Sequence, residues 1–184
     1  MGPVSRSDLG EEGRLHLAYA DKTLVTQIDG LGAASATTPQ TDWLTSSATL
    51  LTLVVRMLEL ADIDPGDRVL EIGTGTGTGY FTALLLCHRL GDKNVTSIEY
   101  DPDVAAQAAA HLDAAGYAPR LVVGDGLQGH SEGAEYSTVI APCAARTIPP
   151  SCLWQLSDAG MIITTLSGWL LASGLVRLAS CVLS

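Results

Sequence analysis

Four glycines at alternate positions follow a short apolar run, and they could bring the backbone close to a ligand. They are Gly73, Gly75, Gly77 and Gly79, and the run before them is residues 69–72. Glycine has no Cβ, so the chain can turn sharply here and present a helix N-terminus to a carboxylate or phosphate. The apolar run predicts a buried strand and residues 81–90 predict a helix. A strand, a glycine turn and a helix are typical of a nucleotide-binding α/β unit.

A carboxylate lies at the distance from this turn that suits a ribose. Glu99 ends a predicted strand over residues 94–99, 20 residues beyond Gly79. A carboxylate accepts hydrogen bonds, and ribose hydroxyls donate them. An isolated Glu at a strand end would be interpreted as a solvated side chain. The spacing after a glycine turn favours ribose binding instead.

A second carboxylate follows the next predicted strand. Asp125 lies between Gly124 and Gly126, directly after residues 121–123. It could accept the amino group of an adenine ring at the sheet edge. It could equally bond its own backbone in a turn, as Asp often does. Both interpretations stay open at this point.

Two cofactors suit such a unit, namely a nicotinamide dinucleotide and S-adenosylmethionine. A dehydrogenase repeats the unit and adds a proton donor, and the chain shows neither. Cys143 follows a predicted strand with nothing nearby to activate it, so we interpret it as a small buried residue. The four histidines have no partner at motif spacing; they are His16, His88, His111 and His130.

The remaining periodicity predicts an α/β domain with a mostly parallel sheet and helices on both faces. Residues 1–47 lack periodicity, and we expect an irregular arm over the active site, with one short helix near 15–19. Residues 48–184 would form the main domain. Its further elements are expected as helices over 49–61, 101–115 and 149–156, and strands over 137–141 and 161–166.

Composition narrows the classes of function. The chain has 184 residues, of which 47% are apolar, and a net charge of −10, which argues against nucleic acid as a partner. Four cysteines without a CxxC pair, and the absence of an apolar signal core, predict a reduced cytoplasmic protein without a metal site. The apolar segment 160–184 could span a membrane, but its glycines and β-branched residues favour two strands, over 161–170 and 174–182.

Taken together, several motifs resemble the protein-L-isoaspartate O-methyltransferase family, whose members are class I S-adenosylmethionine-dependent (Rossmann-like) carboxyl methyltransferases. The motifs are Val69-Leu-Glu-Ile-Gly-Thr-Gly, Val95-Thr-Ser-Ile-Glu, Val123-Gly-Asp-Gly and Ile148-Pro-Pro. The resemblance implies Thr49 as the catalytic hydroxyl that orients a substrate carboxylate, although its place before a helix also suits an N-cap. It implies cofactor binding by Glu71, Gly73, Thr74, Gly75, Gly77, Glu99, Tyr100, Asp125 and Gly126.

A narrower resemblance concerns actinobacterial homologues that accompany ATP-grasp ligases in the maturation of ribosomal peptides (graspetides). It is carried by residues 18–21, 24–29, 85–90 and 165–170. It implies methylation of a normal Asp in a constrained peptide, after which the next backbone nitrogen attacks the ester and closes an aspartimide. Isoaspartyl repair is the alternative activity.

Three departures from the family pattern support an alternative of another class, a degenerate homologue that binds cofactor or peptide without turnover. The glycine turn is longer by one Gly-Thr pair, Leu50-Leu51 replaces a Gln-Pro-like pair, and Ser137 stands where the family has Asp. We expect the extra pair to bulge or to shift the helix start. The chain also ends early, so an exposed sheet edge could pair two copies into a homo-oligomer.

Overall fold

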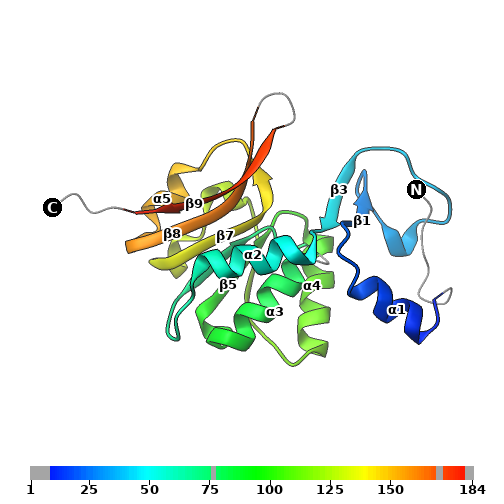
Figure 1. Ribbon diagram of the computed structural model, residues 1–184, viewed down its shortest axis with the longest axis horizontal. Coiled ribbons are helices and arrows are strands. Elements are labelled where there is room, and N and C mark those ends of the chain that lie inside the picture. The colour runs from blue at the N-terminus through cyan, green and yellow to red at the C-terminus, as the bar shows by residue number, and fades with distance from the viewer. Residues whose placement is uncertain (1–8, 76–77, 169–171, 181–184) are drawn as a thin grey trace.

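The computed structural model describes residues 9–75, 78–168 and 172–180, which form two sheets and their covering helices (Figure 1). In that view α1 and the smaller N-terminal sheet, coloured blue to cyan, lie at one end, with β8 and β9 toward the other. The larger sheet and the helices that pack on it form the α/β domain that the sequence predicts.

The larger sheet has six strands in the order β6-β5-β4-β7-β8-β9. All neighbours are parallel except β8 and β9, so the prediction of a mostly parallel sheet is confirmed. The chain runs outward from β4 to β6 and then returns to the other side of β4 with β7. This reversal is a topological switch point, where α/β sheets bind ligands at the carboxyl ends of their strands. The strands are β4 (Val69–Ile72), β5 (Val95–Glu99), β6 (Arg120–Val123), β7 (Tyr136–Ala145), β8 (Leu156–Ser167) and β9 (Ser173–Ala179).

Helices cover both faces of this sheet, as predicted. They are α2 (Leu51–Ala61), α3 (Thr78–Leu90), α4 (Pro102–Ala114) and α5 (Pro150–Trp154). The expected start of α4 is confirmed, because Asp101 caps it by accepting from the backbone N–H groups of Asp103 and Val104. The start of α3 lies three residues before the expected Phe81. Residues 76–77 lie outside the described part of the chain, so the expected effect of the extra Gly-Thr pair on the turn stays a prediction.

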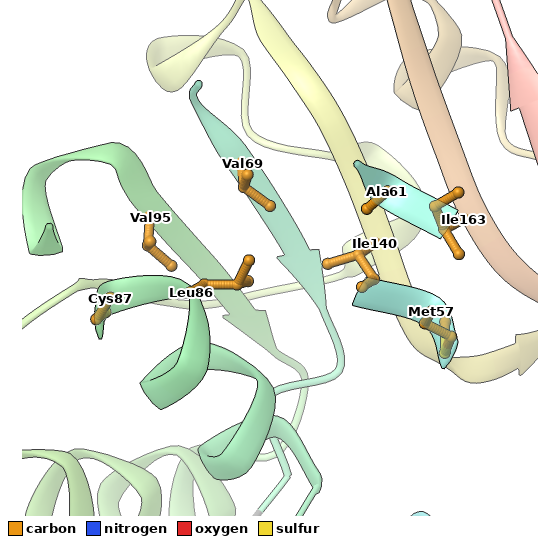
Figure 2. Packing of buried hydrophobic residues seen from close by; sticks show 8 residues of the cluster. All are labelled: Met57, Ala61, Val69, Leu86, Cys87, Val95, Ile140 and Ile163. Atoms are coloured by element: carbon orange, nitrogen blue, oxygen red, sulfur yellow. The ribbon is translucent and has the colours of Figure 1, made fainter. Parts of the chain in front are cut away.

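Two apolar clusters bind the helices to the sheet. Figure 2 shows the first, in which α2 and α3 pack on β4, β5, β7 and β8 through Met57, Ala61, Val69, Leu86, Cys87, Val95, Ile140 and Ile163. The second includes Cys152 of α5 with Leu70, Ile98, Tyr136, Val139 and Ile162. Leu70 and Val69 are neighbours in β4 and belong to different clusters, as the alternation of side chains along a strand requires. Burial on both faces fixes the central strands.

The expectation of an irregular N-terminal arm is wrong. Besides α1 (Glu11–Ala18), which is near the predicted short helix, the segment forms an antiparallel sheet in the order β2-β1-β3. The strands are β1 (Leu24–Ile28), β2 (Leu31–Gly32) and β3 (Leu44–Ala48). The missed signal is Asp29-Gly30, where both residues have positive φ (47° and 76°), as the tightest hairpin turns require.

The C-terminal apolar segment forms strands. β8 and β9 pair from Met161↔Ala179 to Ser167↔Ser173, which confirms two strands there, although β8 begins earlier than expected. Residues 169–170 and 181–182 of the predicted strands lie outside the described part of the chain. Within the described residues, no helix has the length and apolar character needed to cross a membrane. β9 is the last strand of the sheet, and pairing of two copies through it stays a prediction.

Candidate cofactor and substrate site

A pocket of about 340 Å³ opens where the carboxyl ends of β4, β5 and β7 face the N-terminal sheet. One wall comes from the main domain and consists of Gly73, Gly75, Glu99, Pro142, Cys143 and Ala144. The opposite wall comes from β3 and the residues after it, namely Leu44, Thr45, Ser46, Ser47 and Thr49. The two sheets therefore build the pocket together, at the switch point where the topology predicts a ligand.

The glycine turn forms the pocket floor with backbone conformations that favour glycine. Gly73 has φ +88° and Gly75 has φ +57°. The N–H of Gly73 donates to Ile98 O at 2.8 Å, and a Cβ on Gly73 would lie 3.3 Å from Cys143 Sγ. A side chain at Gly73 would thus be strained by its φ and crowded by its neighbour. Gly77, the third predicted glycine of the binding turn, lies outside the described residues.

Glu99 lines the pocket and is held in place by two backbone N–H groups. Gly75 N donates to Glu99 Oε2 at 2.7 Å, and Asp101 N donates to Glu99 Oε1 at 3.1 Å. A carboxylate oxygen has two lone pairs, so each oxygen retains capacity for a ligand hydroxyl. The location agrees with the predicted ribose acceptor. The bond to Gly75 also couples this carboxylate to the glycine turn.

Glu71 and Thr74 lie in the interior and do not line the pocket. Glu71 is fully buried, and its Oε2 accepts from Ser97 Oγ of the neighbouring strand. Ser97 Oγ lies 2.6 Å from Thr74 Oγ1, which is also fully buried. Burial raises the pKa of Glu71 well above its ordinary value of 4.5, despite hydrogen bonds from Ser97 and Thr82 that lower it. These side chains support the glycine turn from below, and direct cofactor contact by either stays a prediction.

Thr49 lies in the link between β3 and α2 and lines the pocket, as a catalytic hydroxyl would. The interpretation of Thr49 as an N-cap is wrong, because the N-cap position of α2 is Leu50, which makes no side-chain capping bond. The free N–H of Thr52 donates instead to Asp21 Oδ1 at 3.1 Å, across 31 residues of chain. These hydrogen bonds from Thr52 lower the pKa of Asp21. The N-terminal segment thereby caps a helix of the main domain.

The predicted adenine contacts differ in their placement. Asp125 is exposed, and its Oδ1 accepts from Leu127 N at 2.9 Å, which is the local turn that competed with adenine binding. Gly126 lines a second pocket, and a Cβ there would lie 2.3 Å from Ile72 Cγ2. Tyr100 is 78% exposed and lines neither pocket. Adenine binding by Asp125 and Gly126, and cofactor binding by Tyr100, stay predictions.

The second pocket, of about 290 Å³, is mainly apolar and shares Cys143 and Ala144 with the first. A bulge causes this arrangement: β7 pairs with β8 through Ala141↔Thr164 and then Ala144↔Thr165, so two extra residues, Pro142 and Cys143, project from the ladder. Desolvation raises the pKa of the Cys143 thiol above its ordinary value. The thiol is therefore protonated at neutral pH and is not an activated nucleophile. The interpretation of Cys143 as a buried residue is wrong, because it is exposed where the two pockets meet.

The family model for Protein-L-isoaspartate(D-aspartate) O-methyltransferase matches residues 1–168. The chain belongs to this family. It is 39% identical over 112 residues to the protein-L-isoaspartate O-methyltransferase of Koribacter versatilis, an alignment that covers 60% of this chain and 48% of that protein. The chain thus spans about half the length of the relatives it matches.

Solved structures agree on the fold. A protein-L-isoaspartate O-methyltransferase superposes with a TM-score of 0.73 at 25% identity, over 90% of this chain and 48% of that one. An RNA methyltransferase from Salinibacter ruber, in complex with S-adenosyl-L-homocysteine, superposes with a TM-score of 0.56 at 24% identity, over 71% of this chain and 92% of that one. The fold is therefore the class I methyltransferase fold that the sequence predicts.

Part of the site in this family member was not predicted from its sequence. Ser46 and Ser47 line the pocket because β3 pairs with β1, a long-range contact that local patterns do not reveal. The run Thr45-Ser46-Ser47 was the available signal, since clustered hydroxyls beside a predicted helix suit a polar ligand. Among the described residues, no group of three or more His, Cys, Asp or Glu side chains could hold a metal ion.

Proposed function

We propose that the chain is an S-adenosylmethionine-dependent carboxyl O-methyltransferase that acts on an isoaspartyl or aspartyl side chain of a peptide. The observation that carries this proposal is the pocket in which the glycine turn, Glu99 and Thr49 converge on one space. Membership of the family, and relatives that are named for isoaspartate methylation, support the same activity. The proposal also places the protein in the cytoplasm.

The described residues fit the cofactor. The positive φ values of Gly73 and Gly75 leave backbone where side chains would otherwise stand, which suits the methionine part. Glu99 presents acceptor oxygens for ribose hydroxyls on the same wall. When bound, S-adenosylmethionine would supply a methyl group on a positively charged sulfur.

The protein's contribution to the reaction is mainly positioning. The substrate carboxylate is already a nucleophile at neutral pH, so no strong base is needed, and orientation with exclusion of water matters more. Thr49 lines the pocket together with Ser46 and Ser47. We assign to Thr49 a hydrogen bond that holds one substrate oxygen while the other attacks. The raised pKa of Cys143 leaves it without a role in proton transfer.

Isoaspartyl peptides are the first substrate class to test, because the named relatives act on that group. A second candidate rests on the resemblance of residues 18–29 to graspetide-associated homologues, and these residues include β1, which pairs with the pocket-lining strand β3. That candidate substrate is a normal Asp in a constrained peptide, whose methyl ester closes to an aspartimide as methanol leaves.

The test is a titration followed by a transfer assay. Isothermal titration with S-adenosylmethionine and S-adenosylhomocysteine should give binding that Glu99→Ala and Asp125→Ala weaken, with Glu132→Ala as an exposed control. Radiolabelled methyl transfer is then measured on matched peptides that differ only in Asp or isoAsp. Transfer to isoAsp alone supports repair, and transfer to Asp in a crosslinked peptide supports the second candidate. Binding without transfer to either would favour a non-catalytic homologue, and no binding by folded protein would refute the proposal.

A further inference from the structure

A buried glutamine joins the N-terminal sheet to the loop after β5. Gln27 is 6% exposed and is the buried residue of β1. The pairing of β1 with β3 is irregular on both sides of Gln27, and such irregularities turn a side chain away from its regular direction. A buried amide must find hydrogen-bond partners to offset its lost hydration. Gln27 finds its partner in the main domain, 74 residues away.

This contact begins a continuous series of hydrogen bonds that ends at the glycine turn. Gln27 Nε2 donates to Asp101 Oδ2 at 3.0 Å. The backbone N–H of Asp101 donates to Glu99 Oε1 at 3.1 Å, and Glu99 Oε2 accepts from Gly75 N at 2.7 Å. Gly75, at one end of the series, lines the first pocket, and Gln27, at the other end, lies in β1, which pairs with the pocket-lining strand β3.

Asp101 links Gln27 to the start of α4, because its two carboxylate oxygens bond to different partners. Its Oδ1 accepts from the N–H groups of Asp103 and Val104 and so caps α4, while its Oδ2 faces Gln27. The hydrogen bond from Gln27 is the largest of the interactions that lower the pKa of Asp101. The carboxylate is therefore charged at neutral pH, and its hydrogen bond with Gln27 is of the stronger, charge-assisted kind.

We propose that Gln27 is a positioning residue of the cofactor pocket, which acts through Asp101 to fix Glu99 and the glycine turn in their binding geometry. The inference rests on the proposed function, because it concerns affinity for the cofactor. It assigns to the N-terminal sheet a task beyond covering the pocket, since the sheet sets the position of a carboxylate on the opposite wall.

A simpler role for Gln27 would be to hold the N-terminal segment against the domain. The structure offers a matched control for that role. Asp21 also joins the segment to the domain, through Thr52 N at 3.1 Å, but among the described residues no series of hydrogen bonds leads from it to Glu99. Loss of Asp21 loosens the segment and leaves the series from Gln27 to Gly75 intact, so the two roles separate in their effect on cofactor affinity.

The experiment measures the Kd for S-adenosylhomocysteine by isothermal titration on the full chain, with thermal unfolding of each variant. Gln27→Glu places two carboxylates together, and we expect its Kd to rise about tenfold, as loss of one charge-assisted hydrogen bond would cause. Asp101→Asn combined with Gln27→Glu restores a donor and an acceptor with their positions exchanged, and Asn still caps α4. We expect the Kd of this double variant to lie within about twofold of that of the unmodified protein, because the two substitutions compensate each other as coupled neighbours. Asp21→Ala should lower the unfolding temperature with little change in Kd.

Several outcomes would overturn the inference. An unchanged Kd for Gln27→Glu would do so, as would a Kd for Asp21→Ala that rises as much as that of Gln27→Glu. A double variant that stays as weak as Gln27→Glu would show that the exchanged pair is not the cause. If Gln27→Glu does not fold, Gln27→Met, which keeps the length and removes the donor, replaces it under the same criteria. Absence of binding by the unmodified protein would instead refute the proposed function itself.

Discussion

The buried carboxyl of Glu71 should make the stability of this protein depend on pH. Its pKa is raised well above 4.5 in the folded protein, first by burial and also by the charge of Glu99. In the unfolded chain the group releases its proton near its ordinary value. Between the two pKa values, unfolding therefore releases a proton, so rising pH favours unfolding. The stability that the protonated group contributes is fully present below 4.5 and is lost as pH rises through the folded pKa.

Linkage sets the magnitude without further assumptions. One proton released on unfolding lowers the free energy of unfolding by up to about 1.4 kcal/mol per pH unit. For a chain of this length that corresponds to a fall of about 3 to 6 °C in unfolding temperature per pH unit. Glu71→Gln keeps the shape and an acceptor for Ser97 and cannot ionise, so it should lose this dependence.

The assay is urea unfolding of the unmodified protein and Glu71→Gln from about pH 5 to about pH 7, where the difference in free energy between them isolates the one group. Glu59→Gln is the control, because Glu59 is an exposed partner of Arg56 and its replacement should leave the slope unchanged. A difference between the unmodified protein and Glu71→Gln that stays constant with pH would refute the reasoning, since it would mean that the carboxyl ionises alike in both states.

Three further outcomes are expected. Gly126→Ala should destabilise the protein by about 1–3 kcal/mol in urea unfolding, because its Cβ would meet Ile72, whereas Gly124→Ala, whose nearest contact is at 4.0 Å, should cost less. Met57→Ala should cost about 2–5 kcal/mol by the same measurement, because Met57 is fully buried, and equal loss in the half-exposed Val55→Ala would contradict this. Cys143 should react slowly with iodoacetamide at neutral pH because desolvation raises its thiol pKa, and bound S-adenosylhomocysteine should slow the reaction further. Peptide mass spectrometry locates the label. Rapid labelling that the ligand does not affect would contradict the placement of Cys143 at the pocket.

The main domain could be predicted from sequence because its signals are local. The periodicity of α2, the Asp101-Pro102 start of α4 and the apolar strands each lie within a few residues of chain, and they agree with one another. The glycine turn and Glu99 followed from spacing within a single βαβ unit. Gly73, Gly75 and Glu99 could therefore be placed at the pocket, because their positions depend mainly on the sequence next to them.

The N-terminal sheet could not be predicted in the same way. Its strands are short: β2 has two residues, and β3 is mostly exposed or half-buried. Neither β2 nor β3 therefore shows a clear alternation of apolar and polar residues. Its position depends on contacts with distant residues, such as the bond from Thr52 to Asp21 and that from Gln27 to Asp101. The wall that β3 adds to the pocket was missed for the same reason.

Only Thr49 and Leu50 separate the end of β3 from the start of α2. The hydroxyl that we assign to the substrate carboxylate therefore lies on a two-residue link between the N-terminal sheet and a helix anchored in the core. Because Met57 and Ala61 anchor α2 in the core, any displacement of the sheet relative to this helix would have to be taken up in the link. A peptide that presses on β3 would thus move Thr49 directly, and the alignment of the reacting groups would depend on how the substrate seats itself.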